Sequence, residues 1–245
     1  MAVKQKIVVA WSGGKDSAMA LWRLQGDERY QVTGLLTTLT EGYDRIQMHG
    51  VRRVLLEAQA ESLGLRLIEV WVPMHAGNDA YEAAMKRALG DLREQGVSAL
   101  VFGDLFLEDI RAYREKMMAG SGLAPMFPLW REDTRLLSGA FLSAGFRATV
   151  ICIDPSALPP GFVGLPYDRA FIDDLPEGAD PCGENGEFHT FVHDGPNFRY
   201  PLRTMLGVKV ERSGFHFADL LPIAPGHAPS GDSVAPAPAN NKILE

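Results

Sequence analysis

The sequence predicts an α/β protein with a mainly parallel sheet that helices cover on both faces. Before residue 104, short apolar runs rich in β-branched residues alternate with longer segments in which apolar residues recur at helical spacing. Parallel strands need a helical crossover between them, so this alternation favours a parallel sheet. A glycine-rich turn directly follows the first strand, and such sheets bind ligands at the carboxyl ends of their strands.

The first half of the chain supplies these elements in order. Four apolar segments with few charges are predicted to be strands: residues 7–11, 31–38, 65–72 and 99–103. Three segments with an apolar stripe are predicted to be helices that end near glycines: residues 15–25, 49–64 and 78–95. Residues 40–48 are polar and predict a loop.

The second half is less regular. A polar helix is expected at residues 108–118, Pro125 and Pro128 are expected to stop regular structure, and a helix after Asp133 precedes a strand at residues 148–153. We therefore expect a core domain at residues 1–122 and a smaller α+β domain at residues 123–221. Residues 222–245 are rich in proline and alanine and lack aromatic residues, which predicts a disordered tail.

Composition limits the classes of function. A chain of 245 residues, 46% of them hydrophobic, can fill a core of its own. With 24 Lys and Arg against 31 Asp and Glu, the net charge of −7 argues against nucleic acid as a partner. No apolar run approaches the roughly 20 residues of a membrane helix and no signal-peptide core is present, so we expect a cytoplasmic protein without membrane contact. Cys152 and Cys182 are expected to be free thiols.

The most informative stretch is the turn between the first strand and the first helix, Ser12-Gly13-Gly14-Lys15-Asp16-Ser17. Its glycines lack the side chains that would keep a polyanion from the backbone, and the helix points unpaired N–H groups at the turn. This geometry binds phosphate. The common triphosphate loop is excluded, because it has four residues between its first glycine and its Gly-Lys-Ser/Thr. An ordinary turn capped by Ser12 or Asp16 is the alternative.

Two more polar segments are candidates for the functional site. Gly103 and Asp104 follow the fourth strand, so they are candidates for the same crevice as the glycine turn. The glycine- and carboxylate-rich residues 180–187 lead into a strand in which Glu187, His189 and His193 share one face by period two, although such side chains also occur facing solvent. Zinc at Cys182, His189 and His193 is a further alternative, but two histidines on one strand face are a poor start for a closed tetrahedron.

The turn at residues 12–17 matches the Ser-Gly-Gly-x-Asp-Ser loop of the ATP pyrophosphatases, which split ATP between its α and β phosphates. Three further motifs follow in order: Met48-His49-Gly50-Val51-Arg52, residues 103–109 with Arg114-Glu115, and residues 182–198. With all four, the chain resembles the diphthine–ammonia ligase family of the adenosine nucleotide α-hydrolase superfamily, over nearly everything before the tail. The resemblance implies a Rossmann-like parallel sheet of the ATP-pyrophosphatase type in the first domain, with a smaller α+β C-terminal domain on the substrate side.

The resemblance also implies an activity. In an ATP-dependent amide synthesis, a substrate carboxylate attacks the α-phosphorus, pyrophosphate leaves, and ammonia displaces AMP from the acyl-adenylate. ATP and Mg²⁺ are the implied cofactors, and a small-molecule or protein carboxylate acceptor and ammonia are the implied partners. The sequence is compatible with a homo-oligomer.

Site residues are implied as well. The ATP-binding set is Ser12, Gly13, Gly14, Lys15, Asp16, Ser17, His49, Arg52 and Gly103. The catalytic set is Lys15, Asp16, Asp104 and Glu187, of which Asp16 and Asp104 would hold the metal. The acceptor-facing set is Glu184, Asn185, Glu187 and His189. A surface cap and a solvated arginine are the alternatives for His49 and Arg52.

The second motif departs from the Gly-Glu-Gly-Gly-Glu of archaeal and eukaryotic relatives at Asn185 and His189, and the chain looks like a bacterial member. This departure concerns the acceptor and leaves the ATP chemistry intact. Two other functions remain open at this point. One is a tRNA-modifying ATP pyrophosphatase, and the other is an adenine-nucleotide-binding regulatory protein without turnover.

Overall fold

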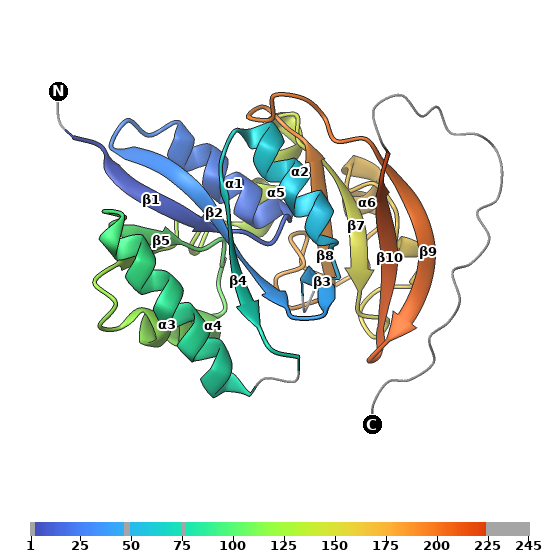
Figure 1. Ribbon diagram of the computed structural model, residues 1–245. Helices are drawn as coiled ribbons and strands as arrows, with labels where there is room; N and C mark the ends of the chain where they lie inside the picture. The colour runs from blue at the N-terminus through green and yellow to red at the C-terminus, as the bar shows by residue number, and fades with distance from the viewer. Residues whose placement is uncertain (1–2, 47–49, 75–76, 224–245) are drawn as a thin grey trace.

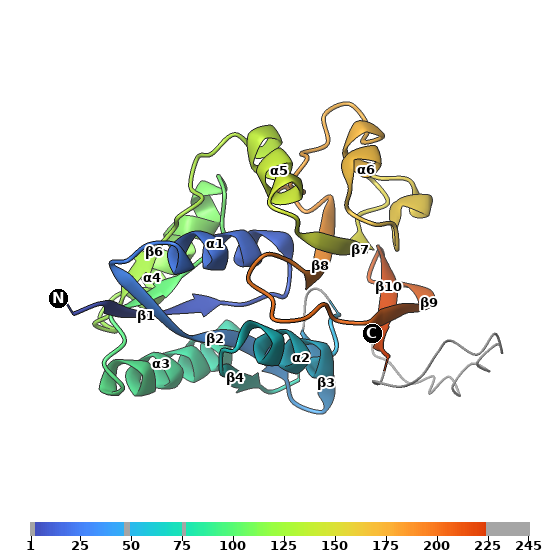
Figure 2. The same cartoon turned by 90° about the horizontal axis from the view of Figure 1, so that it is seen from above.

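Two sheets make up the framework of the chain, in a computed structural model that describes residues 3–46, 50–74 and 77–223 (Figure 1). The first sheet is mainly parallel, as predicted, and the second is antiparallel. Figures 1 and 2 place the second sheet beyond the carboxyl ends of the central parallel strands. The second half of the chain therefore packs beside the strand ends where open parallel sheets bind their ligands.

In the first sheet, β1 (Gln5–Ala10) lies between β2 (Tyr30–Thr40) and β5 (Ala99–Val101) and pairs with both in parallel. The outer parallel strands are β4 (Leu67–Val72), beside β2, and β6 (Ala124–Met126), beside β5. In chain order, β2 and β4 therefore lie on one side of β1, and β5 and β6 lie on the other side. β1 and β5 flank the switch point, where open parallel sheets bind their ligands.

Helices cover both faces of this sheet. Val8 belongs to a buried cluster with residues of α3 (Asn78–Glu94), whereas Ile7 and Val9 belong to a cluster with α1 (Lys15–Gln25) and α2 (Arg53–Leu63). α4 (Glu108–Met118) joins the first cluster through Met118. The predicted two-sided burial is confirmed. Among the described residues, no helix has the length and apolar character needed to cross a membrane.

Two short strands differ from the sequence prediction. β3 (Tyr43–Ile46) lies inside the predicted loop and pairs antiparallel with β2, from Thr40 back to Leu39. Pro125 sits in the middle of β6, so the expectation that it stops regular structure is wrong. β6 ends its row of parallel strands, and an edge strand tolerates the missing N–H of proline on its outer side. The predicted domain boundary, between residues 122 and 123, falls just before this strand.

The second sheet has the order β8-β7-β10-β9. Its elements are α5 (Thr134–Ser143), β7 (Arg147–Ile153), a 3₁₀ turn (Pro160–Phe162), α6 (Arg169–Asp173), β8 (Phe188–Asp194), β9 (Thr204–Arg212) and β10 (Phe215–Pro222). An aromatic cluster packs against β8, with Tyr167 beside Phe141, Phe171 and Phe188. Cys152 and Cys182 are buried free thiols, as predicted. Residues 224–245 of the predicted tail lie outside the described residues.

Candidate nucleotide site

The turn after β1 lies against the end of β5. A Cβ atom at Gly103 would be 2.9 Å from the carbonyl carbon of Asp16 and 2.9 Å from the nitrogen of Ser17. Only a residue without a side chain fits this approach of two backbones. The structure therefore brings together the glycine turn and the Asp104 turn, as their positions at adjacent strand ends predicted.

Gly13 meets two separate requirements for glycine. Its φ of +78° lies in the left-handed region, which side chains disfavour, and a Cβ there would be 2.9 Å from Oε1 of Gln59. A Cβ at Gly14 would be 3.1 Å from the carbonyl oxygen of Thr190. The turn is thus enclosed by α2 on one side and by β8 on the other.

Two of the backbone N–H groups that were predicted to bind phosphate donate hydrogen bonds to hydroxyl oxygens of the protein. The Gly14 N–H donates to Ser12 Oγ at 3.2 Å, and the Lys15 N–H donates to Thr190 Oγ1 at 3.1 Å. Ser17 Oγ lies 3.2 Å from Ser12 Oγ and donates to the Gly14 carbonyl. A phosphate at these N–H groups would replace the Ser12 and Thr190 oxygens.

Gln59, which the sequence analysis missed, ties the turn to its surroundings. Its Oε1 accepts the Trp11 indole N–H at 2.9 Å, and its Nε2 donates to the carbonyls of Gly13, at 3.0 Å, and Val192, at 2.6 Å. The side chain is fully buried. A signal was present, because Gln59 lies four residues after Leu55, on the stripe of α2 that was predicted to be apolar.

Lys15 and Asp16 form an ion pair at the start of α1. The Lys15 ammonium lies 2.9 Å from Oδ1 and 2.7 Å from Oδ2 of Asp16, with the lysine side chain almost fully buried. Burial lowers the pKa of Lys15, but the Asp16 carboxylate together with Cys182 and Glu184 outweighs this effect, so that the pKa is raised overall. Lys15 therefore carries a positive charge beside the N–H groups of the turn.

Asp104 faces Arg114 of α4. Oδ2 of Asp104 lies 3.6 Å from Nε of Arg114, and both are buried atoms without a hydrogen-bond partner among the described residues. Burial raises the pKa of Asp104, Arg114 opposes that shift, and the Asp16 charge adds to it. Oδ2 of Asp104 is thus an acceptor that no hydrogen-bond donor of the described residues satisfies.

A magnesium ion is implied by the family resemblance, and Asp104 fits it. Mg²⁺ is commonly held by one or two carboxylates together with substrate phosphates, which the unsatisfied oxygen of Asp104 could complement. Asp16 is less available, because both of its oxygens contact Lys15. No group of three or more His, Cys, Asp or Glu in the described parts of the chain is arranged to hold a metal, and this includes Cys182, His189 and His193.

Glu184 joins the carboxylate-rich turn at residues 180–187 to the Asp104 turn. Its Oε1 accepts the N–H of Leu105 at 2.7 Å and that of Phe106 at 3.4 Å. Burial raises the pKa of Glu184 to about 7; the Leu105 N–H opposes this shift and the Asp16 charge adds to it. The second motif therefore contacts the turn after β5 through this carboxyl group.

The raised pKa of Glu184 predicts a pH dependence of stability. A carboxyl whose pKa rises on folding, here from 4.5 to about 7, stabilises the fold below pH 4.5 and loses that contribution as the pH rises to about 7. Urea unfolding across this range is expected to show that the parent protein loses stability relative to Glu184→Gln. Glu28→Gln, at an exposed position, is the control. Parallel curves for the parent and Glu184→Gln would contradict the assignment.

Glu187 and Asn185 hold the turn in shape. Oε1 of the buried Glu187 accepts the N–H of Asp180 at 2.9 Å and Nδ2 of Asn185 at 3.0 Å. Glu187 precedes β8, in which Thr190 and, on the same face, Phe188 contact the glycine turn. Because side chains alternate along a strand, His189 points to the other face. Acceptor contacts by Asn185, Glu187 and His189 stay predictions.

Arg52 forms an ion pair with a residue of the second sheet. At the start of α2, its Nε lies 3.0 Å from Oδ1 and its Nη2 2.5 Å from Oδ2 of Asp219 in β10. Arg45 shares the same carboxylate at 2.9 Å. These ion pairs link the first sheet to the second, while the Arg52 side chain stays 36% exposed. Its contact with ATP stays a prediction, and His49 lies outside the described residues.

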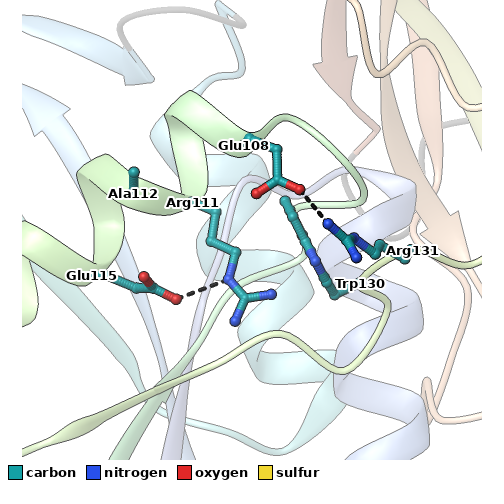
Figure 3. A pocket seen from close by; sticks show the side chains of 6 residues that line it. All are labelled: Glu108, Arg111, Ala112, Glu115, Trp130 and Arg131. Carbon is teal, nitrogen blue, oxygen red and sulfur yellow. Dashed lines mark hydrogen bonds and ion pairs between the residues drawn. The ribbon is translucent and has the colours of Figure 1, made fainter.

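A cavity of about 440 Å³ opens beside the Asp104 turn, between α4 and residues 130–131 (Figure 3). Its lining combines two ion pairs with an aromatic ring: Glu108, Arg111, Ala112, Glu115, Trp130 and Arg131. The Arg111 guanidinium lies over the Trp130 ring at 4.7 Å, and Arg131, with a left-handed φ of +61°, donates its N–H to the Leu105 carbonyl. The sequence did not single out this cavity, because its walls meet only in the fold.

A glycine turn at the switch point of a parallel sheet, beside a charged lysine and an unsatisfied carboxylate, defines a nucleotide-binding α/β protein. Residues 5–125 match the model of the diphthamide synthase N-terminal domain, and residues 133–219 match that of the diphthamide synthase C-terminal domain. The chain belongs to the diphthamide synthase family. The resemblance inferred from the four sequence motifs is confirmed.

Two curated relatives are named diphthine–ammonia ligase. The one from Danio rerio is 30% identical over 126 residues, 49% of this chain and 48% of the relative. The one from Bos taurus is 25% identical over 152 residues, 60% of this chain and 57% of the relative. The chain spans about half the length of the curated relatives it matches. A solved structure, described as a predicted tRNA methyltransferase subunit from Methanocaldococcus jannaschii, is 18% identical over 58% of this chain and 77% of that one, with a TM-score of 0.40.

Proposed function

We propose that the protein is an ATP-dependent ligase that adenylates a substrate carboxylate, releases pyrophosphate and joins the acyl group to ammonia. The observation that carries the proposal is the contact of three motifs with one another at the carboxyl ends of β1 and β5. The glycine turn meets Gly103, and Glu184 bonds to the N–H of Leu105 in the same turn after β5. Relatives named diphthine–ammonia ligase support this reaction class.

ATP would bind with its phosphates at the glycine turn. The N–H groups of Gly14 and Lys15 would donate to phosphate oxygens in place of the Ser12 and Thr190 hydroxyls. The Lys15 ammonium would balance the charge that develops on the departing pyrophosphate. Positive charge and N–H groups directed at one place favour cleavage of a phosphoanhydride without a nucleophilic side chain.

Mg²⁺ would be held by Asp104, with Asp16 contributing if its pair with Lys15 opens. When bound, the ion would neutralise charge on the ATP phosphates. Arg114, 3.6 Å from Asp104, would keep that carboxyl positioned in the meantime. The protein's own contribution is therefore to orient the carboxylate and keep it close to the loop.

The acceptor would approach from the side of the second sheet. Glu184 stands at the crevice, and Glu187 with Asn185 fixes the turn that presents it. The cavity lined by Arg111 and Trp130 lies next to the same turn after β5 and has the volume of a ligand site. Diphthine and ammonia, the substrates named for the relatives, are the first candidates.

The test is a product assay with ATP, Mg²⁺, ammonium and a protein that carries diphthine. AMP and pyrophosphate are expected in equal amounts, together with an amide on the acceptor, and mixtures without acceptor or without ammonium are the controls. ADP as product, or no turnover, would contradict the ligase assignment. Turnover that requires tRNA in place of the acceptor would favour the tRNA-modifying class.

A further inference from the structure

β9 is the outermost strand of the second sheet (Figure 1). Among the described strands only β10 pairs with it, whereas β8, at the other end of the sheet, has its edge against the glycine turn. Four large apolar side chains of β9 are between 39% and 59% exposed: Met205, Leu206, Val208 and Val210. Soluble proteins usually cover or interrupt an apolar edge strand of this length, because it invites pairing with another chain.

Opposite charges flank Val210 on this strand. Lys209 and Glu211 are both exposed, and neither has an ion pair within the described ranges. The pairing of β9 with β10 is regular over residues 209–212, opposite residues 215–218, and its register shifts only between Ala218 and Leu220. The charged segment is therefore a straight piece of edge strand.

An antiparallel pair of identical strands related by a two-fold axis at Val210 is complementary. Lys209 would lie opposite Glu211 of the partner subunit, and by symmetry Glu211 would lie opposite Lys209 of the partner subunit. The two copies of Val210 would meet at the axis.

We propose that β9 is the interface of a homodimer in which two copies of the second sheet join edge to edge in this register. The occupant of the edge is a second copy because Lys209 and Glu211 are complementary in charge when the strand pairs with itself. Pairing also supplies partners for the outer backbone N–H and C=O groups of β9. The interface leaves the glycine turn, at the opposite end of the sheet, free.

The test is sedimentation of the full chain over a range of concentrations, with charge substitutions at the interface. The parent protein is expected to have twice the monomer mass of 26.8 kDa. Lys209→Glu and Glu211→Lys each place two like-charge pairs at the axis and are expected to weaken the dimer about tenfold or more. The double variant restores both pairs and is expected to restore the dimer. Lys86→Glu, on the exposed face of α3, is the control and is expected to change nothing.

Two outcomes would overturn the proposal. One is a monomer at every concentration. In that case something other than a second copy, such as residues after Ile223 or another molecule, would cover β9. The other is a dimer that the single charge changes leave intact or that the double variant fails to restore, which would place the interface or its register elsewhere. Circular dichroism of each variant separates loss of association from loss of folding. None of these measurements depends on ATP turnover, so the ligase assignment stands or falls separately.

Discussion

Replacing Lys15 with methionine is expected to lower ATP turnover to AMP by about 10²- to 10³-fold. Methionine nearly preserves the length of the side chain but removes the charge that the glycine turn directs at phosphate, and loss of one such group commonly has an effect of that size. Formation of labelled AMP and pyrophosphate measures the change. Lys86→Met, at an exposed position of α3, is the matched control and is expected to keep full turnover.

The same substitution also separates a structural function of Lys15 from a chemical one. It leaves the Asp16 carboxylate without the ammonium that lies 2.7 Å away, and breaking a buried pair on one side costs about 3–5 kcal/mol in the free energy of unfolding. Asp16 is partly exposed, so we expect the lower end of that range. Adding Asp16→Asn to Lys15→Met is expected to recover stability without recovering turnover. Recovery of both would mean that Lys15 only supports the fold.

Gly103→Ala is expected to have the second large effect. The new methyl group would stand 2.9 Å from backbone atoms of Asp16 and Ser17, neither of which can move without displacing the glycine turn or the start of α1. Overpacking of this kind costs about 1–3 kcal/mol. We expect a lower midpoint of thermal unfolding and a loss of ATP turnover greater than the loss of stability explains.

Gly90→Ala is the matched control for Gly103→Ala. Gly90 lies on the exposed surface of α3, and a Cβ atom there meets nothing within 4 Å. Alanine is favoured over glycine in a helix by up to about 1 kcal/mol, so this variant is expected to be slightly more stable and fully active. Equal ATP turnover by Gly103→Ala and Gly90→Ala would show that turnover does not require the close backbone approach at Gly103.

The parallel sheet could be predicted because each of its long elements has a strong local pattern. Val8 and its neighbours are apolar on both faces of β1, and the helices between strands show a clear stripe. β3 and β6 could not be predicted, because each is short and depends on its partner strand. Pro125 argues against a strand until β6 is known to lie at the edge.

The site could be predicted where chain order fixes spatial order. The glycine turn and Gly103 follow strands that became neighbours at the switch point, so their meeting followed from topology alone. Gln59 and Thr190 could not be found in this way. Thr190, whose hydroxyl accepts a hydrogen bond from the Lys15 N–H, is 175 residues away from Lys15, and no local periodicity in the sequence indicates such a contact.

The partners that single charged residues find in the fold could not be predicted from the sequence. The contact of Arg52 with ATP stays a prediction, and its guanidinium pairs with Asp219, 167 residues further along the chain. The catalytic function of Glu187 also stays a prediction: its Oε1 bonds within its own turn, whereas its buried Oε2 has no hydrogen-bond partner among the described residues. Such ion pairs and turn contacts arise from packing that the sequence pattern does not specify.

β8 contacts both parts of the proposed site, the glycine turn and the carboxylate-rich turn at residues 180–187. Its Thr190 and Val192 bond to the glycine turn, while the turn with Glu184 and Glu187 leads directly into its first residue. A phosphate that takes the place of the Thr190 hydroxyl would pull on the same strand that positions the acceptor side. In the proposed reaction, phosphate binding and acceptor binding would therefore be coupled through β8, and such coupling works equally in both directions. Such an enzyme would bind its two substrates in concert, and would leave an activated intermediate little chance of meeting water alone.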